Sequence, residues 1–311
     1  MKTIQELTHT RYPFIQGGMA NIATGTFAAD VANAGALGLI AGGGLDADGL
    51  REQIRIAKAR TDQPFGVNLM LMAPDIDRMA EVVVEEGIRF LTTGAGNPGK
   101  YMKMWKEAGI TVVPVCASVA LAQRMVRVGA DAIIAEGTES GGHVGEMTTM
   151  TLVPQMVDAV DVPVIAAGGI ADGRQLAAAY MLGACGVQMG TALLVSRECP
   201  IHDGYKEALL KAKDNSTVVT GRSLRAPVRV LKNEMSREYL RLEQQMSDRM
   251  ELERLTLGSL RKAVFDGNTK EGSLMAGQVC GQLSEIRPLA EIFASLDEEA
   301  KQVMKERCAN L

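Results

Sequence analysis

Eight short apolar runs are spaced at near-regular intervals along the first two thirds of the chain, and this rhythm limits the fold more than any other feature. The runs are continuous rather than alternating, which is typical of parallel strands covered on both faces. They occupy residues 13–19, 37–44, 64–70, 89–96, 111–117, 131–137, 163–170 and 186–194. Eight such units predict an α/β fold, a closed TIM (β/α)8 barrel, and leave an open doubly wound sheet as the alternative.

The stretches between the runs have the periodicity of amphipathic helices. Apolar residues recur there at spacings of three and four, and a glycine follows several stretches, where it can end a helix in the left-handed conformation. The predicted helices cover residues 24–34, 48–60, 75–86, 100–108, 118–128 and 172–182. Asp75, Ser118 and Asp172 are the expected N-caps of three of them.

The composition changes after Gly221, where the strand–helix rhythm stops. Residues 222–241 hold six basic and two acidic side chains, and a charged stretch with helical periodicity follows. Small residues and glycine then return before the final helical stretches. The expected parts are a barrel over 1–221, a helical insertion over 222–270 that covers the barrel mouth, and a return segment over 271–311 with closing helices at 286–296 and 298–308.

The overall composition excludes several classes of protein. The net charge of −4 gives no general attraction to nucleic acid, and neither a signal sequence nor a membrane span is visible. The five cysteines show no CxxC spacing, so we expect free thiols in a cytoplasmic protein, with neither a disulfide framework nor a metal site.

Glycine is enriched at the ends of the predicted strands, which is where the active site of such a barrel lies. A single glycine is an ordinary turn residue, whereas paired glycines after several strands indicate a ligand lying against the main chain. The ends of the seventh and eighth runs offer unobstructed N–H groups, and the seventh also precedes a predicted helix, so both predict a phosphate site. Its residues are Gly168, Gly169, Gly190 and Thr191.

The most polar strand end follows the sixth run and contains His143 beside two glycines. His9 lies near the start of the chain and His202 has no glycine context. His143 is therefore the candidate for proton transfer near neutral pH, rather than a structural or solvated histidine. Cys116, near the end of the fifth run, is expected to be a packed thiol rather than a nucleophile.

Several stretches resemble the nitronate monooxygenase superfamily of FMN-dependent barrels. They are QGGM at 16–19, GVNLM at 66–70, AEGTESGGHVGE at 135–146, PVIAAGGIADG at 163–173, GVQMGTALL at 186–194 and MAGQVCG at 275–281. Within this superfamily, two features are similar to the flavin-dependent enoyl-acyl carrier protein reductases, the type II enoyl reductases. One is Val144, where the monooxygenases commonly have arginine after the histidine, and the other is RVLKNEMSREYLRLE at 229–243.

The resemblance implies FMN at the mouth of the 1–221 barrel. The residues implied beside the isoalloxazine ring and ribityl chain are Gly17, Gly18, Met19, Asn68, Glu136, Gly141 and Gly142. The phosphate would lie on the four residues at the seventh and eighth strand ends, which agrees with the glycine pattern. The residues implied to cover the flavin from the return segment are Met275, Ala276, Gly277 and Gln278.

Three functions remain open. The resemblance implies that NADH or NADPH reduces FMN and that the flavin then reduces a trans-2-enoyl chain on acyl carrier protein, the last step of fatty-acid elongation. His143 would either donate the proton or polarise the thioester carbonyl. The alternative in the same superfamily is a nitronate monooxygenase, which oxidises alkyl nitronates with O2. A flavin-free isomerase or aldolase acting on a phosphate ester is the third, although no strand run carries the lysine of a Schiff-base aldolase.

The resemblance also implies partners. Acyl carrier proteins are acidic, and a basic run could steer one toward the barrel or could be an ordinary solvated face. The run comprises Arg222, Arg225, Arg229, Lys232, Arg237 and Arg241. Related reductases are often dimeric and cation-stimulated, so the resemblance implies a homodimer and a monovalent cation, although the sequence shows no ligand pattern for such an ion.

Overall fold

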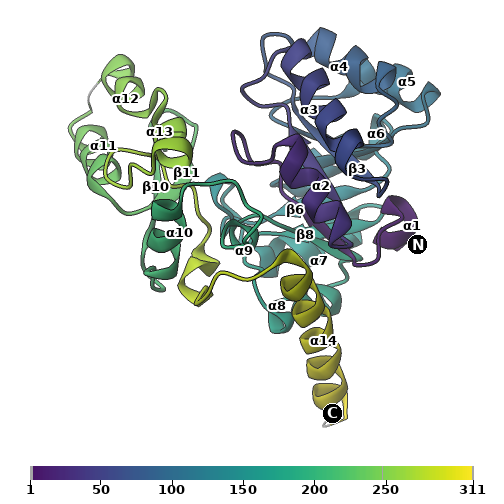
Figure 1. Cartoon of the computed structure of the whole chain (residues 1–311). Helices are drawn as coiled ribbons and strands as arrows, with labels where there is room; N and C mark the ends of the chain where they lie inside the picture. The colour runs from purple at the N-terminus through teal and green to yellow at the C-terminus, as the bar shows by residue number, and fades with distance from the viewer. Residues whose placement is uncertain (1–2, 247, 310–311) are drawn as a thin grey trace.

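A closed barrel of eight parallel strands forms the centre of the computed structural model, which describes residues 3–246 and 248–309 (Figure 1). The strands are β1 (Phe14–Gln16), β2 (Gly38–Ala41), β3 (Phe65–Met70), β4 (Phe90–Gly94), β5 (Thr111–Cys116), β6 (Ile133–Glu136), β8 (Val164–Ala167) and β9 (Gly186–Met189). Their order is β1-β9-β8-β6-β5-β4-β3-β2, and a parallel bridge between Ile15 and Leu37 closes the circle. Each strand lies within one predicted run, so the barrel is confirmed and the open sheet is wrong.

Helices pack around the outside of the barrel. They are α1 (Ile4–Thr8), α2 (Gly25–Asn33), α3 (Ala47–Arg60), α4 (Ile76–Glu85), α5 (Gly99–Glu107), α6 (Val119–Arg127), α7 (Thr149–Ala159), α8 (Gly173–Met181), α9 (Thr191–Leu194) and α10 (Asp203–Leu210). Ser118 and Asp172 cap α6 and α8 with their side chains, as expected. Asp75 does not cap its own helix, because its carboxylate accepts a hydrogen bond from the Ala47 N–H at the start of α3, at 2.7 Å.

The chain beyond the barrel contains strands as well as the predicted helices. β10 (Thr217–Thr220) and β11 (Val228–Leu231) form an antiparallel pair, and β11 also pairs with β7 (Gly142–His143) in the loop after β6. Together with α11–α13 they form a lobe beside the barrel (Figure 1). The remaining elements are α11 (Glu234–Gln244), α12 (Arg249–Thr256), α13 (Ser259–Asp266), the 3-10 helix η1 (Gln278–Gln282) and α14 (Leu289–Cys308).

The last helix, α14, is continuous where the sequence predicts two helices separated at residue 297. Asp297 lies inside it and pairs with Lys301 one turn later, at 2.6 Å, so the acidic residue supports the helix instead of starting a new one. α14 packs along α8, and the Glu299 carboxylate accepts a hydrogen bond from the Gly173 N–H at 2.8 Å. This contact ties the end of the chain to the barrel.

The barrel interior is apolar below and polar at the carboxyl ends of its strands. Buried aliphatic and aromatic side chains, among them Ile15, Phe90, Ile134 and Ile165, fill the lower part. Because side chains alternate along a strand, the next inward positions can be read from the register. Those positions are Asn68 and Thr92, which are paired on β3 and β4, and Glu136 and Gln188, which both register with Ala167. The fold therefore places a polar layer where a barrel keeps its active site.

The seam between β1 and β2 is closed partly by a side chain. Gln16 donates a hydrogen bond from Nε2 to the Leu39 carbonyl at 3.3 Å, and its Oε1 accepts one from the Leu39 N–H at 3.4 Å. A primary amide has the same donor and acceptor as a peptide group, so the buried Gln16 side chain extends the ladder where β1 has ended.

Candidate active site

The loop after β1 contacts the ends of β3 and β9. The Gly17 N–H donates to the Met189 carbonyl at 2.7 Å. A Cβ on Gly18 would lie 2.4 Å from Cγ of Asn68, so only glycine allows this approach. Asn68 in turn donates from Nδ2 to the Thr92 hydroxyl at 2.9 Å, which fixes the orientation of its amide.

Three glycines at the ends of β8 and β9 present unused main-chain donors. In the part of the chain that the structure describes, the N–H groups of Gly168, Gly169 and Gly190 donate no hydrogen bond. Gly168 and Gly169 have φ of +88° and +76°, a region that favours glycine. A Cβ on Gly190 would meet only Met19 Sδ, at 3.4 Å. These open N–H groups are the arrangement that an anion needs.

The start of α8 contributes less to this site than its sequence position indicates. The N–H groups of Ala171 and Asp172 both donate to Oε1 of Gln175, and the Gly173 N–H donates to Glu299. The first turn of α8 is therefore already capped. A phosphate here would rely on the loop glycines and not on the helix terminus. The sequence-based expectation that the start of this helix contributes is therefore wrong, although the residues proposed for the phosphate stay the same.

The return segment lies against the loops after β6 and β9. The Gly277 N–H donates to the Thr191 hydroxyl at 2.8 Å, and the Gln278 N–H donates to the Glu139 carbonyl at 2.9 Å. A Cβ on Gly141 would lie 2.7 Å from the Ala276 carbonyl carbon. The small residues that return in the sequence near the end are therefore required by close main-chain approach.

A buried tyrosine and a methionine connect this segment to the rest of the site. The Tyr205 hydroxyl donates to the Met275 carbonyl at 2.7 Å, and Met275 forms a bridge with Val230 at β11. The Met275 sulfur lies 3.5 Å from the position of a Cβ on Gly142. Tyr205 was not identified from the sequence, because nothing in its local pattern indicates a partner seventy residues away.

His143 lies at the exposed rim of the site, where β7 pairs with β11 opposite Val228. The neighbouring β11 residue, Arg229, is buried and holds the base of the same loop: its Nε donates to the Thr138 carbonyl at 3.0 Å and its Nη1 to the Thr217 hydroxyl at 3.1 Å. Burial lowers the pKa of Arg229, and the negative charge of Glu139 partly offsets this shift. Arg229 is therefore an internal support and not part of a basic surface.

Glu136 is the ionisable group deepest in the mouth. Its carboxylate forms no hydrogen bond or ion pair that meets ordinary geometry within the described residues, and desolvation raises the pKa of Glu136 to about 7, with the Ser140 side chain opposing that shift. Cys116 behaves as expected of a packed thiol, since burial raises its pKa to about 12.

The residues present fit a flavin with a phosphate. Two buried polar atoms at the mouth, Ser140 Oγ and Gln188 Oε1, have no hydrogen-bond partner in the described part of the chain, and such atoms normally have one. Together with the three unused glycine N–H groups, they offer donors and acceptors to a ligand. Gln188 lies within a motif noted in the sequence, and the alternation of β9 could have identified it as inward-facing.

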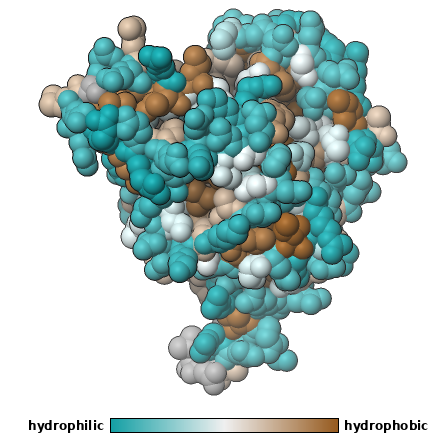
Figure 2. Space-filling view, turned by 60° about the vertical axis from the view of Figure 1, so that its left-hand side comes forward, coloured by the Kyte–Doolittle hydropathy of each residue, from teal (hydrophilic) through white to brown (hydrophobic). Residues whose placement is uncertain are grey.

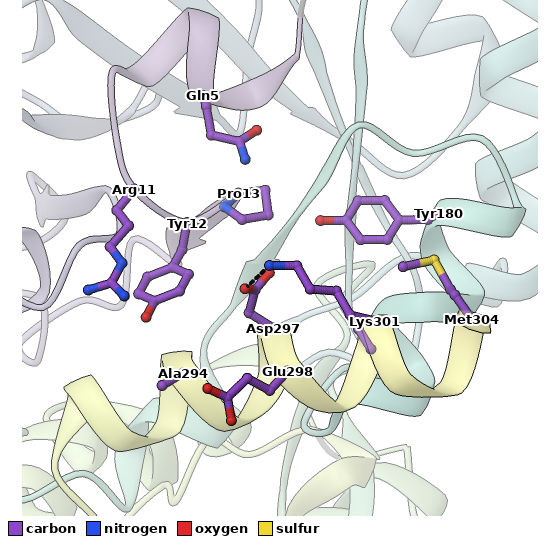
Figure 3. A pocket seen from close by; sticks show the side chains of 11 residues that line it. Gln5, Arg11, Tyr12, Pro13, Tyr180, Ala294, Asp297, Glu298, Lys301 and Met304 are labelled. Carbon is purple, nitrogen blue, oxygen red and sulfur yellow. Dashed lines mark hydrogen bonds and ion pairs between the residues drawn. The ribbon is translucent and has the colours of Figure 1, made fainter. Parts of the chain in front are cut away.

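A cavity of about 520 Å³ lies elsewhere, at the opposite end of the barrel (Figure 3). Arg11, Tyr12 and Pro13 line it just before β1, and Tyr180 and Lys301 face them from α8 and α14. In barrels of this kind the catalytic groups project from the carboxyl ends of the strands, and this cavity lies at the amino ends. We therefore place the active site at the glycine-lined mouth, where the unpartnered polar groups gather.

The fold and site define a class: a (β/α)8 barrel whose mouth suits a flat, phosphate-bearing cofactor. The family model for nitronate monooxygenase matches residues 2–85 and 75–299. The chain belongs to the nitronate monooxygenase family, whose members are flavin-dependent oxidoreductases. The resemblance seen in the sequence is thereby confirmed at the level of the family.

The individual proteins that this chain resembles are named for different activities. A (3aS,4S,5R,7aS)-5-hydroxy-7a-methyl-1-oxo-octahydro-1H-indene-4-carboxyl-CoA dehydrogenase of Mycobacterium tuberculosis is 33% identical, over 94% of each chain. A probable nitronate monooxygenase of Staphylococcus saprophyticus is 33% identical, over 88% of this chain and 90% of the relative. The structure of FabK from Thermotoga maritima matches with a TM-score of 0.97 and 44% identity over 100% of both chains.

The structure shows neither a metal-binding cluster nor a membrane-spanning helix among the residues that it describes. Among residues 3–246 and 248–309, no group of three or more histidine, cysteine, aspartate or glutamate side chains is placed to hold a metal ion. None of the helices in these ranges is both long and apolar enough to cross a bilayer.

Proposed function

We propose that the protein is an FMN-dependent enoyl-acyl carrier protein reductase that uses NADH or NADPH. The observation that carries this proposal is the match to FabK, the flavin-dependent enoyl reductase, because its identity is higher than that of the monooxygenase relative above and it extends over both whole chains. The layout of the site supports it: bare glycine N–H groups for a phosphate, and a covering segment held by Thr191 and Glu139.

Bound FMN would supply hydride transfer to the enoyl β-carbon, and the chain would supply orientation and proton control. Gly168, Gly169 and Gly190 would donate main-chain N–H groups to the phosphate, beside Thr191. Gly17, Gly18, Met19, Asn68, Glu136, Gly141 and Gly142 would border the ring and ribityl chain, and Met275, Gly277 and Gln278 would cover them. His143 at the rim would donate a proton to the α-carbon or polarise the thioester carbonyl.

An acidic carrier protein has a smaller basic surface to recognise than the sequence implies. Arg229 is buried, Arg222 pairs with Glu146 and Arg241 pairs with Glu238. The members of the run that are exposed and have no charged partner among the described residues are Arg225, Lys232 and Arg237. We propose that these three cations steer the carrier protein, a role that long-range electrostatics supports.

Charge reversal tests this surface. Replacing Arg225, Lys232 and Arg237 by glutamate should lower kcat/KM for carrier-bound enoyl substrate and flatten its salt dependence, while leaving a small enoyl thioester unaffected. Reversing Lys103 and Arg124, two exposed cations on α5 and α6, is the matched control. If the variant with three reversed charges and the control with two have equal kinetics with carrier-bound substrate, these three cations do not dock the carrier protein.

Anaerobic stopped-flow absorbance tests the activity itself. Bleaching of the flavin by NADH or NADPH, followed by reoxidation with an enoyl thioester, is the expected result. The monooxygenase alternative, favoured by the family model and the staphylococcal relative, predicts reduction by alkyl nitronates and rapid reoxidation by O2 without a nucleotide. If the protein cannot be reconstituted with FMN, the result favours the third alternative, an isomerase or aldolase that works without flavin. Light scattering on the same sample tests the expected homodimer.

A further inference from the structure

Glu136 ends β6 and faces the inside of the barrel. It registers with Ala167 on β8, which registers with Gln188 on β9, and Ile134 two residues earlier packs in the barrel interior. Its carboxyl group is therefore directed into the mouth, beside Ser140 and on the same layer as Gln188, the two residues with unpartnered buried atoms.

Within the part of the chain that the structure describes, no cation neutralises this carboxyl group. The inward residues of β3, β4 and β9 at the same level are neutral, and so are the β1 loop at 17–19 and the return segment at 275–278. The charged groups of the surrounding loops are all engaged or exposed: Glu146 pairs with Arg222, and Asp172 caps α8 and pairs with Arg174. Three further groups lie closer to the mouth. They are Glu139, which accepts hydrogen bonds from Thr149 at the start of α7, Arg229, which bonds to Thr138 and Thr217, and His143 on the exposed rim.

We propose that Glu136 is a proton-linked contact of the cofactor: it is held as the neutral acid when FMN is bound, and FMN binding takes up a proton. The proposal rests on the proposed FMN site and deepens it. A flavin over the mouth removes the remaining water from a carboxyl group that has no counterion, and brings the negative charge of the phosphate into the same site. Both effects disfavour the carboxylate further.

The direction of the pH dependence follows from this. In the free protein burial already raises the pKa of Glu136 to about 7, and bound FMN raises it further. Affinity is then at its full value below pH 7 and is lost as the pH rises from there toward the pKa of the bound state. Glu136→Gln is the isosteric neutral mimic, and it should bind FMN at pH 8.5 as the wild-type protein does at pH 6.

The test is the dissociation constant of FMN, measured by fluorescence quenching between pH 6 and pH 8.5 for wild-type and E136Q proteins. The ratio of the two constants is the readout, because ionisation of the FMN phosphate affects both proteins alike. The wild-type constant should rise about tenfold relative to E136Q over this range, the size expected of one group titrating near 7. Calorimetry at pH 7.5 in buffers of different ionisation enthalpy should show uptake of about half a proton to one proton, absent in E136Q.

Two control variants test whether Glu136 itself causes the pH dependence of FMN binding. E146Q removes an exposed glutamate of the same loop and should keep the wild-type pH dependence, as should His143→Asn, which removes the histidine on the exposed rim. A ratio that stays flat, or that falls as the pH rises, would overturn the proposal, and so would loss of the dependence in His143→Asn. If wild-type protein binds no FMN at any pH, the proposed cofactor fails instead, so the two failures are distinguishable. If E136Q does not fold, a wild-type proton uptake of zero at pH 7.5 still refutes the proposal.

Discussion

The hydroxyl of Thr191 is the one side-chain acceptor for the Gly277 N–H, and its removal gives a quantitative test of how the return segment is held. Both residues are buried, and the hydrogen bond between them is 2.8 Å long. Thr191→Val keeps the shape of the side chain but leaves this N–H without a partner. An unpaired buried donor costs about 1–3 kcal/mol.

Local opening of the segment should become easier by the same amount. Since a factor of ten corresponds to about 1.4 kcal/mol, amide exchange in residues 274–283 should accelerate about 5- to 150-fold. Hydrogen–deuterium exchange followed by mass spectrometry resolves this peptide. Thr191→Ser is the matched control, because it loses a methyl group and keeps the hydroxyl, and its exchange should stay close to the wild-type rate.

The comparison has a clear refuting result. If Thr191→Val exchanges at the wild-type rate in 274–283, the hydroxyl does not hold the segment. If Thr191→Ser accelerates as much as Thr191→Val, packing of the methyl group is responsible and not the hydrogen bond. Peptides from α3 and α4, on the far part of the barrel, should be unchanged in both proteins and report any global loss of stability.

Four other outcomes follow from the structure. Ala95 has a φ of +53°, so Ala95→Gly should raise the free energy of unfolding by up to about 1 kcal/mol in urea titrations, and a loss of stability would contradict the strain. Gly168→Ala, at φ +88° and with a carbonyl oxygen 2.9 Å from the new Cβ, should destabilise the fold and weaken FMN retention, whereas tight FMN would show that the glycine is not needed. Burial raises the pKa of the Cys116 and Cys199 thiols to about 12, so iodoacetamide should label them only after unfolding, as peptide mapping can check. Because the pKa of Glu136 is raised on folding, the flavin-free protein loses stability between its unfolded pKa and pH 7, and E136Q should therefore gain melting temperature over wild type at pH 8 but not at pH 5.

The barrel could be predicted from the sequence because its strands are buried on both faces. Such strands must be apolar throughout, and the glycine that follows several of the helices marks where the next strand begins. The strands β7, β10 and β11 could not be found in this way. β7 has two residues, and β11 contains Arg229, whose charge argues against a buried strand until its partners at Thr138 and Thr217 are known.

The site was predictable to the extent that it is made of main chain. Paired glycines after a strand are visible in the sequence, and Gly18 and Gly141 do lie against Asn68 and Ala276. Long-range side-chain contacts left no local pattern. From its sequence neighbours Tyr205 would be taken for an ordinary helix residue, and only the fold brings its hydroxyl to the return segment.

The seam between β1 and β2 that Gln16 helps to close also has a consequence for the order in which the chain folds during synthesis. During synthesis β1 and β2 emerge early and can pair through the main-chain bridge between Ile15 and Leu37, but β9, the partner on the other side of β1, begins only at Gly186. At about 5–20 residues per second the ribosome needs on the order of ten to thirty seconds to supply it. β2 is available much sooner, and the amide of Gln16 gives β1 a bond to Leu39 before the barrel can close. A Gln16→Leu chain would keep the Ile15–Leu37 bridge but lose both side-chain bonds to Leu39, so its first strand would wait for β9 with a weaker attachment to β2. The cost should appear first as aggregation of nascent protein, and only later as a lower melting temperature.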